Sequence, residues 1–433
     1  MDINKHEIKG VEMNKKSIGV LRNIAKLSAT VILISTLSAC STAQPEAAQI
    51  VKSGAPTLAV ALTGTLTNIV SQQRLSALSA SRLYGYTFFA AQEAFQSEMD
   101  LGNKEEKLAV IAAVHAATSV AKSILSGAKL PSRELEALER RYASNPDGGG
   151  KAAKSRGIKT AEKFIERAKV DGFNEASDAP QPKIEDTKWD WEPTGTMRMP
   201  FIEPGYGNVK PLVESTVNCT LPSPSLPTIK EESIKLFENF DPASAANEEV
   251  LLFLAGNGTP TPPGQMLVIA ANSARSTKMD ESSSMNFISA IAIAGNDAGI
   301  AVWREKSKHM LARPETIYFR ETGKQVQLPR ETPAHPSYPS GHSGFSGSAV
   351  EIMNTILGST AKMKIVAPED LAAPRVVFEF TSPDTLLKAV SSSRVSAGFH
   401  TKTDVIAGES LGKCVGQTVY NALQKLTSRG DQK

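Results

Sequence analysis

The sequence has little net charge of either sign for its length. Its 433 residues include 48 Lys and Arg and 45 Asp and Glu, a formal net charge of +3, and several of the cations fall within the first 26 residues. The rest of the chain is near neutral and has no dense basic stripe, so it offers no electrostatic footprint for nucleic acid. An alternating apolar–polar strand pattern and an internal repeat are also lacking. With 41% hydrophobic residues, the chain can still bury a large core.

The N-terminal segment lacks an apolar run long enough to span a bilayer comfortably. A basic stretch, 15–26, precedes an apolar run, 29–37, which ends in Leu37-Ser38-Ala39-Cys40. This order is typical of a secretory signal, and its end resembles a bacterial lipobox, whose cysteine is diacylated and becomes the mature N-terminus. We therefore predict lipidation at Cys40. An ordinary secretory signal with an incidental cysteine is the alternative.

The residue that follows Cys40 indicates where the protein goes. It is Ser41 rather than aspartate, which resembles an outer-membrane sorting signal. We expect an exported, lipid-anchored protein in the outer membrane or periplasm of a Gram-negative bacterium. The long stretch before Lys15 leaves open whether translation starts at Met1 or Met13.

Only two further cysteines are present, Cys219 and Cys414. An oxidising periplasm permits a disulfide between them. The sequence does not give the distance between the two thiols, so a disulfide and two unpaired thiols both stay open.

Apolar residues at spacings of three and four predict helices within 74–98 and 105–126. The glycines at 148–150 predict a loop, and 256–264 predicts a second loop before a long apolar helix at 285–303. A Pro-rich, aromatic stretch cannot be a regular helix, and we expect it to wrap over the helices as an ordered belt. The predicted segments are a lipoprotein signal peptide (1–39), a flexible tether (40–57), an N-terminal helical part (58–176), the wrapping segment (177–230) and a C-terminal helical part (231–433).

Three short polar motifs stand within about one hundred residues of one another in the C-terminal part. They are Lys306-x6-Arg313-Pro314, Pro339-Ser340-Gly341-His342 and Ser393-Arg394-x5-His400. Together they supply three cations, two histidines, a hydroxyl group and a backbone N–H beside a glycine. An oxyanion with several negative oxygens needs dispersed positive charge and directional donors, and the planar arginine fork matches two oxygens at once. The joint set predicts a site for a phosphate-like or vanadate-like oxyanion.

The motifs also predict different roles for the two histidines. Ser340 and Gly341 precede an apolar helical run, where free N–H groups and the helix dipole favour an anion. His342 on this turn is then a general acid or base. Asp404 follows His400 by four residues, which on a helix puts both on one face, so the carboxylate can orient a nucleophilic or ligating imidazole.

These motifs resemble those of the superfamily that joins type 2 phosphatidic acid phosphatases, bacterial class A acid phosphatases and vanadium-dependent haloperoxidases. The similarity to soluble bacterial haloperoxidase-like proteins extends over roughly residues 75–415 through Trp191-x-Pro193, Pro204-Gly205-Tyr206-Gly207-x-Val209-x-Pro211, Thr261-Pro262-Pro263-Gly264 and Asn296-Asp297-Ala298-Gly299-Ile300-Ala301-x-Trp303. The resemblance implies an all-α, multi-helix-bundle fold with the oxyanion at one end of a four-helix bundle.

The resemblance also implies a role for each residue of the motifs. His400 would bind vanadium apically or attack phosphorus, and His342 would donate a proton to peroxide or to the leaving group. The equatorial oxygens would be held by Lys306, Arg313, Ser340, Gly341 and Arg394.

The neighbours of the motifs bear on which reaction the site performs. His335 resembles a residue of algal bromoperoxidases and Trp303 one of a fungal chloroperoxidase, whereas the sequence from His400 to Gly408, with Thr401 in place of an aromatic, resembles acid phosphatases. We predict an enzyme that oxidises halide with hydrogen peroxide at a histidine-bound vanadate, with Trp303 and His335 tuning the pocket.

Two alternatives stay open. One is a periplasmic acid phosphatase without a cofactor, which hydrolyses phosphomonoesters through a phosphohistidine. The other is a non-catalytic surface lipoprotein on the same scaffold. The expected partners are small-molecule substrates and, through the lipid, a membrane. Halide preference, natural substrate and oligomeric state are not specified by the sequence.

Overall fold

The computed structural model describes residues 55–102, 106–126, 131–144, 148–183, 187–243, 259–366 and 377–428. All of them belong to one unit, Gln49–Lys433. The predicted signal peptide, the lipidation site Cys40 and most of the tether lie outside the described residues.

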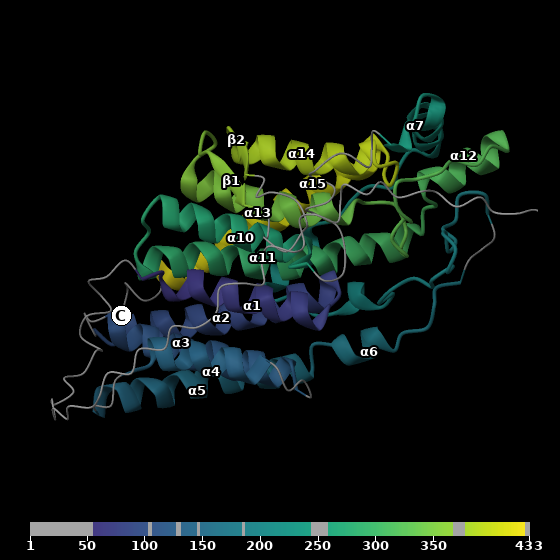
Figure 1. Cartoon of the computed structure of the whole chain (residues 1–433). Coiled ribbons are helices and arrows are strands. Elements are labelled where there is room, and N and C mark those ends of the chain that lie inside the picture. The colour runs from purple at the N-terminus through teal and green to yellow at the C-terminus, as the bar shows by residue number, and fades with distance from the viewer. Residues whose placement is uncertain are drawn as a thin grey trace, which may run out of the picture. The chain divides into compact units, whose positions relative to one another are not determined.

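The first six helices form one side of the molecule (Figure 1). Helix α2 packs against α3, and α3 packs against α4 and α5. A Cβ on Gly157 of α5 would lie 2.2 Å from the carbonyl oxygen of Ala112 on α3, so the two helices meet backbone to backbone. The predicted loop at 148–150 is wrong, because α5 begins at these glycines. The helices are α1 (Leu58–Gln73), α2 (Ala77–Asp100), α3 (Glu106–Ile124), α4 (Pro131–Tyr142), α5 (Gly148–Lys169) and α6 (Phe173–Ser177).

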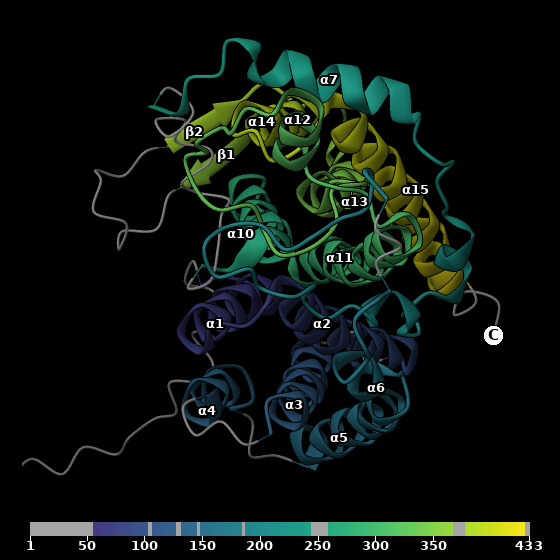
Figure 2. The ribbon, with the colours of Figure 1, turned by 90° about the vertical axis from the view of Figure 1, so that its right-hand side faces the viewer.

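The Pro-rich segment after α6 runs as irregular chain between the two groups of helices, as the end-on view in Figure 2 shows. It contains two short 3-10 helices, η2 (Tyr206–Asn208) and η3 (Glu214–Asn218). Asp297 accepts hydrogen bonds from the backbone N–H groups of Leu212 and Val213 at 2.7 and 2.8 Å. Trp191 is only 2% exposed. The segment is therefore fastened to the core by buried contacts.

A disulfide between Cys219 and Cys414 ties the end of this segment to the last helix. It resolves the two alternatives that the sequence left open for these cysteines. Because 195 residues separate the two cysteines, the bond closes a long loop.

The remaining helices form the second side of the molecule (Figure 1). Helix α10 begins at Thr261, inside the segment expected to be a loop, because proline is accommodated at the first positions of a helix. Two short strands pair antiparallel, with Met363 opposite Phe380, although no strand pattern was recognised in the sequence. The elements are α7 (Leu226–Glu238), α10 (Thr261–Ser276), α11 (Glu281–His309), α12 (Pro314–Thr322), α13 (Gly341–Leu357), β1 (Met363–Val366), β2 (Val377–Phe380), α14 (Pro383–Ser396) and α15 (Lys402–Ser428). The prediction of an all-α fold is confirmed.

Helices α11, α13, α14 and α15 pack on one another as a four-helix bundle, and α10 covers α11 and α13. Helices α13 and α15 touch along a seam of glycines. A Cβ on Gly412 would lie 2.2 Å from the Gly344 carbonyl oxygen, and one on Gly408 would lie 2.5 Å from that of Ser340. Only glycine permits this approach. The seam therefore holds the first turns of α13 and α15 side by side.

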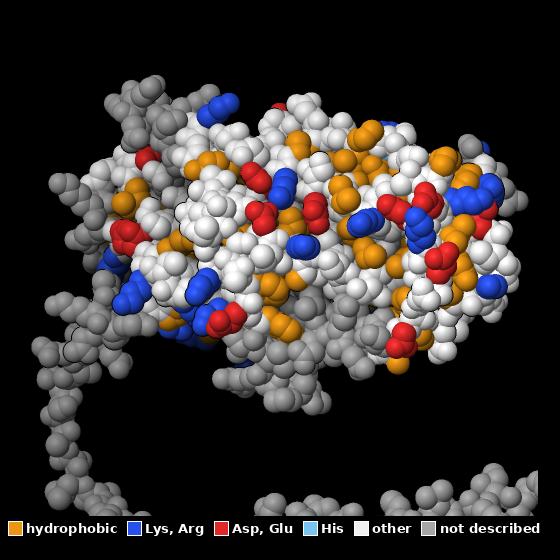
Figure 3. Space-filling view, turned by 90° about the horizontal axis from the view of Figure 1, so that it is seen from above, with side chains coloured by type: hydrophobic (Ala, Val, Ile, Leu, Met, Phe, Trp, Pro, Cys, Tyr) orange, Lys and Arg blue, Asp and Glu red, His pale blue; other side chains and the backbone are white. Residues whose placement is uncertain are grey.

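Two described helices, α3 and α11, are long and apolar enough to cross a membrane by length and composition alone. In α11, 94% of the most apolar window is buried inside the protein, and in α3 the share is 67%. Burial in the core accounts for the apolar character of α11. On the face shown in Figure 3, basic and acidic side chains are interspersed.

Candidate oxyanion site

The three polar motifs meet at one end of the four-helix bundle, the end that faces the viewer in Figure 2. Lys306 lies in the last turn of α11, and Arg313 and Ser340 are the N-cap residues of α12 and α13. Arg394 lies in the last turn of α14, and His400 stands just before α15. All five side chains are buried. Helix ends thus bring together residues that are far apart in the sequence.

Backbone carbonyl groups hold two of the three cations in place. The Lys306 ammonium donates to the carbonyl oxygens of Pro336 and Ser337 at 2.5 and 3.0 Å. The Arg313 guanidinium donates to the carbonyl oxygens of Pro333, His335 and Phe399 at 2.9–3.1 Å. Carbonyl groups orient these cations but do not neutralise their charge. Burial lowers the pKa of Lys306, and it lowers the pKa of Arg313 to about 10.

Arg394 is the cation with the fewest partners. Its side chain is 1% exposed, its guanidinium carbon lies 4.7 Å from the centre of the Phe399 ring, and its Nε and one terminal nitrogen have no hydrogen-bond acceptor. Burial, together with the charges of Arg313 and Arg330, lowers its pKa to about 9. Buried donors without acceptors are costly and rare. An anion placed against these donors would remove that cost.

The carboxyl group of Asp404 is the acidic group that faces this cluster. Its Oδ2 accepts from the Ser337 hydroxyl at 2.7 Å and from the Thr401 N–H at 2.9 Å, and it lies 3.4 Å from His400 Nδ1. Burial raises the pKa of Asp404, while these donors and the nearby cations favour the carboxylate. The expectation that His400 and Asp404 share a helix face is wrong in detail. His400 precedes α15, and the chain between the two residues turns into the helix.

The His400 imidazole presents its other nitrogen to the cations. Nε2 lies 3.2 Å from a terminal nitrogen of Arg313, which can only donate, so Nε2 is the acceptor and Nδ1 bears the proton. Burial and the charges of Arg313 and Lys306 keep the pKa of His400 well below its usual range. The imidazole is therefore neutral, and the lone pair on Nε2 points into the cation cluster. Such a lone pair can attack phosphorus or ligate vanadium.

The first turn of α13 supplies hydroxyl and amide groups. The Ser340 oxygen accepts from the Ser343 hydroxyl at 3.1 Å and from the Ser343 N–H at 3.4 Å, and the Ser343 hydroxyl lies 3.0 Å from that of Ser391 on α14. Gly341 opens the helix beside the Trp303 ring. His342 follows it and is partly exposed. The start of α13 therefore lies beside Trp303 of α11 and is linked to Ser391 of α14.

Trp303 and His335, the two residues expected to tune the pocket, lie against each other with 5.0 Å between ring centres. Lys306 Nζ lies 5.9 Å from the centre of the Trp303 ring, and Arg313 lies 3.0 Å from His335 Nδ1. Burial and the neighbouring cations lower the pKa of His335. His335 is therefore neutral and lends no further charge to the cluster.

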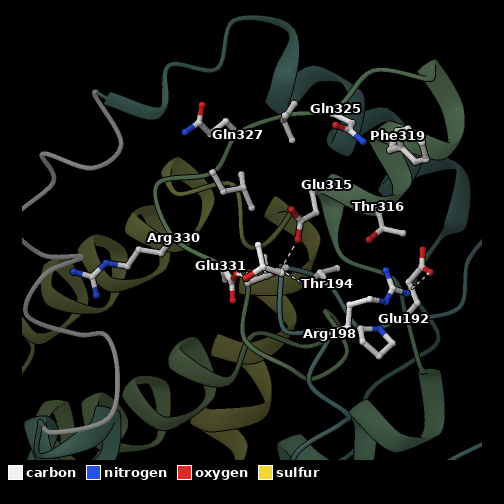
Figure 4. Close-up of a pocket in the computed structure, with 16 residues that line it drawn as sticks. Glu192, Thr194, Arg198, Glu315, Thr316, Phe319, Gln325, Gln327, Arg330 and Glu331 are labelled. Carbon is white, nitrogen blue, oxygen red and sulfur yellow. Dashed lines mark hydrogen bonds and ion pairs between the residues drawn. The ribbon is translucent and has the colours of Figure 1, made fainter. Parts of the chain in front are cut away.

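A cleft of about 610 Å³ lies next to the cluster and is lined by none of its residues (Figure 4). Its walls come from 192–198, from α12 and from 325–332. Glu315 on α12 is hydrogen-bonded to Thr332, and the carbonyl group of the following residue, Pro333, binds Arg313. The loop that contains Thr332 and Pro333 therefore lines the cleft and also contacts the oxyanion site.

Sequence reasoning predicted that seven residues of the motifs and Asp404 form one site, but it missed the contacts of Ser337 and the link between Ser343 and Ser391. Ser337 lies two residues before the second motif and was given no role, yet its hydroxyl group binds Asp404 and its carbonyl group binds Lys306. The Ser343–Ser391 link was not foreseen. The signal available in the sequence was the position of Ser337, between His335 and the second motif.

The donor set fits an oxyanion rather than a metal cation. Among the described residues, no group of three or more His, Cys, Asp or Glu side chains could hold a metal ion. Vanadate, by contrast, needs hydrogen-bond donors for its oxygens and one lone pair for its metal. The unpaired nitrogens of Arg394, together with Lys306, Arg313 and the α13 turn, supply the donors, and His400 Nε2 supplies the lone pair.

Two of the comparisons with known proteins found matches. Residues 321–429 match the family model described as VCPO second helical-bundle domain. The matched residues include the second and third motifs. No curated protein matches the sequence.

Solved structures share the fold over most of their length. A structure titled as the first bacterial vanadium-dependent iodoperoxidase has a TM-score of 0.71 and 22% identity, over 85% of this chain and 96% of that one. Holo and apo structures of a bacterial vanadium-dependent chloroperoxidase have TM-scores of 0.61 and 0.62 at 16% and 14% identity. They cover 82% and 83% of this chain and 93% and 98% of theirs.

Proposed function

We propose that the protein is a vanadate-dependent haloperoxidase that oxidises a halide ion with hydrogen peroxide. The observation that carries the proposal is the buried Arg394 guanidinium, whose unpaired donors lie among two further buried cations. Such a cluster requires a multivalent anion. Bound vanadate supplies the activation of peroxide toward halide.

The chain's own residues would then do the following. Lys306, Arg313 and Arg394 hold the oxyanion by charge and by directed N–H groups. His400 holds it through Nε2, while Asp404 faces Nδ1, so that Nδ1 keeps its proton. His342, which is next to the α13 anion-binding turn, moves a proton to or from the oxygen substrate. The Trp303 and His335 rings, packed around Lys306, close the site against water.

Two observations favour peroxide chemistry over phosphate-ester hydrolysis. The neutral His335 and the Trp303 ring adjoin Lys306, as the resemblance to haloperoxidases implies. The fold also resembles that of proteins titled as iodoperoxidase and chloroperoxidase, and this likeness supports the choice of halide oxidation. Acid phosphatase activity is the second candidate, because the His400–Asp404 pair is equally suited to a nucleophilic histidine.

A paired assay on one preparation tests the choice. Protein stripped of phosphate and vanadate is given peroxide with bromide or iodide, and separately a phosphomonoester, each with and without added vanadate. We expect halide oxidation only with vanadate. Phosphomonoester hydrolysis that vanadate inhibits, without halide oxidation, would make the protein a phosphatase. If both reactions are absent and vanadate does not protect the protein against heat, the scaffold is non-catalytic.

We further propose that the protein is exported and anchored by a lipid on Cys40. The disulfide between Cys219 and Cys414 supports an oxidising compartment. Labelling with a fatty-acid analogue, compared between the wild type and Cys40→Ser, tests the anchor. Labelling of both proteins, or of neither, would contradict it.

A further inference from the structure

The hydroxyl group of Ser337 lies between the two side chains of the His400–Asp404 pair. It is 2.7 Å from Asp404 Oδ2 and 3.5 Å from His400 Nδ1. The direct distance from His400 Nδ1 to the same Oδ2 is 3.4 Å, longer than an ordinary hydrogen bond of this type. All three side chains are at most 1% exposed. The Ser337 hydroxyl group therefore donates to the carboxylate oxygen that would otherwise accept a shorter hydrogen bond from His400 Nδ1–H.

Asp404 Oδ2 is fully occupied by this arrangement. Besides Ser337, it accepts the Thr401 N–H at 2.9 Å, and these two donors are the short ones. The other oxygen, Oδ1, is buried and has no hydrogen-bond partner, so it does not compensate for the long contact to His400. A carboxylate bonded closely to Nδ1–H makes the opposite ring nitrogen a stronger donor of its lone pair. Because the contact between Asp404 and His400 is long, Nε2 is a weaker donor of its lone pair.

Ser337 is held in place by its own backbone. Its N–H donates to the Leu311 carbonyl oxygen at 2.8 Å, and its carbonyl oxygen accepts from Lys306 at 3.0 Å. The hydroxyl group can therefore be removed without releasing the chain that carries it. The same backbone contacts fix the distance between Ser337 and Asp404.

We propose that Ser337 is a positioning residue that competes with His400 for Asp404 and thereby keeps the bond between His400 and a bound oxyanion weak. This inference rests on the proposed role of His400 as the ligand of vanadate. A weak bond allows the oxyanion to exchange with solution. The residue would thus determine how strongly the site prefers vanadate, which bonds to the imidazole, over inorganic phosphate, which the cations hold without such a bond.

The test measures the dissociation constants of vanadate and of inorganic phosphate by calorimetry on the full chain. In Ser337→Ala, Asp404 is free to close on His400, and we expect vanadate to bind about tenfold more tightly. Phosphate affinity should change by less than about twofold, because its donors are untouched. Ser337→Thr, which restores a hydroxyl group, should restore the wild-type preference. Ser348→Ala removes another buried hydroxyl group, bonded to the Phe345 carbonyl oxygen away from the site, and should change neither constant.

A double variant tests the route of the effect. If Ser337 acts through Asp404, then Ser337→Ala should change vanadate affinity in the wild-type background and not in Asp404→Asn. Unchanged or weaker vanadate binding in Ser337→Ala would overturn the proposal, as would an equal effect on both anions.

Failure of the proposed function gives a different result. A wild-type protein that binds vanadate no more tightly than phosphate lacks the His400 bond, and both ideas then fall. A wild type that prefers vanadate but does not oxidise halide contradicts only the proposed reaction, and the serine variants still decide the role of Ser337.

Discussion

The backbone N–H of Ser340 donates a hydrogen bond to the carbonyl oxygen of Asp404, with 2.9 Å between N and O. This bond joins the N-cap of α13 to the first turn of α15. It places the anion-binding turn directly beside the residue that orients His400. The glycine seam between α13 and α15 makes this short distance between Ser340 and Asp404 possible. The geometry of the site therefore depends on the seam.

We expect Gly412→Ala to damage the site from a distance. The added Cβ would meet the Gly344 carbonyl oxygen at 2.2 Å, which forces α13 and α15 apart. Such overpacking costs roughly 1–3 kcal/mol of unfolding free energy. Chemical denaturation should show that loss, and vanadate affinity should fall with it. Gly64→Ala on α1 is the control, because the added Cβ has no neighbouring atom within 4 Å, and it should leave vanadate affinity unchanged. Gly358→Ala is unsuitable, because Gly358 has a positive φ that strains any other residue.

Arg394→Ala should abolish protection of the protein by oxyanions. Hydrogen bonds to charged groups contribute roughly 1.5–3 kcal/mol each, so affinity for vanadate and phosphate should fall at least about tenfold. The shift of the thermal midpoint with added phosphate measures the loss. Arg330→Ala is the matched control, since it removes an exposed positive charge near enough to lower the pKa of Arg394. Equal protection of Arg394→Ala and wild type would show that the oxyanion binds elsewhere.

His342→Ala separates binding from chemistry. His342 is assigned to proton transfer, so its removal should lower halide oxidation by about 100-fold or more while vanadate affinity stays within a few-fold of wild type. Steady-state kinetics and calorimetry on the same preparation measure the two effects. A loss of affinity as large as the loss of turnover would instead place His342 among the oxyanion donors.

The sequence was informative about the site because each motif begins or ends a helix. Arg313 before Pro314 and Ser340 before Gly341 are local signals for N-caps, and both are N-caps in the structure. What the sequence could not supply was the pairing of side chains across elements. Ser337 and Asp404 are 67 residues apart, and nothing local to either predicts their 2.7 Å contact. The disulfide was undetermined for the same reason.

Errors of secondary structure have a related physical cause. The glycines at 148–150 and the prolines at 262 and 263 were taken as loop formers, whereas both groups stand in the first turn of a helix. In the first turn the N–H groups are not needed for intrahelical bonds, so proline costs little there. In α5, burial of Ala153 and Gly157 against α3 outweighs the low helix propensity of glycine. Tertiary packing therefore decided the glycine case, and position in the first helical turn decided the proline case.

Reduction of the Cys219–Cys414 disulfide should destabilise the protein without changing the residues of the site. The bond joins the wrapping segment to α15, and closing a loop of this length restricts the unfolded chain. We expect the Cys219→Ser, Cys414→Ser double variant to lose roughly 2–5 kcal/mol of unfolding free energy. Urea unfolding with and without reductant measures this loss. Reductant should lower the unfolding free energy of the wild type to that of the variant and leave that of the variant unchanged. Equal stability of all four samples would contradict the expectation.

The stability of the protein should also respond to pH through Glu281, at the start of α11. Its carboxylate accepts the N–H of Leu58, the first residue of α1, at 2.9 Å. Burial, with the nearby charges of Glu106 and Asp280, raises the pKa of Glu281 to about 7. A folded-state pKa above the unfolded value means that this group's contribution to stability is fully present below about pH 4.5 and is lost as the pH rises through about 7.

Glu281→Gln keeps an oxygen acceptor for Leu58 and cannot ionise. The variant should therefore unfold at a higher temperature than wild type at pH 8.5 and at nearly the same temperature at pH 5, as thermal denaturation at the two values would show. Glu93→Gln, which removes a carboxylate in a largely exposed pair with Lys163, should show no such pH-dependent gain. A gain for Glu281→Gln that is equal at both pH values would mean that ionisation of Glu281 is not its source.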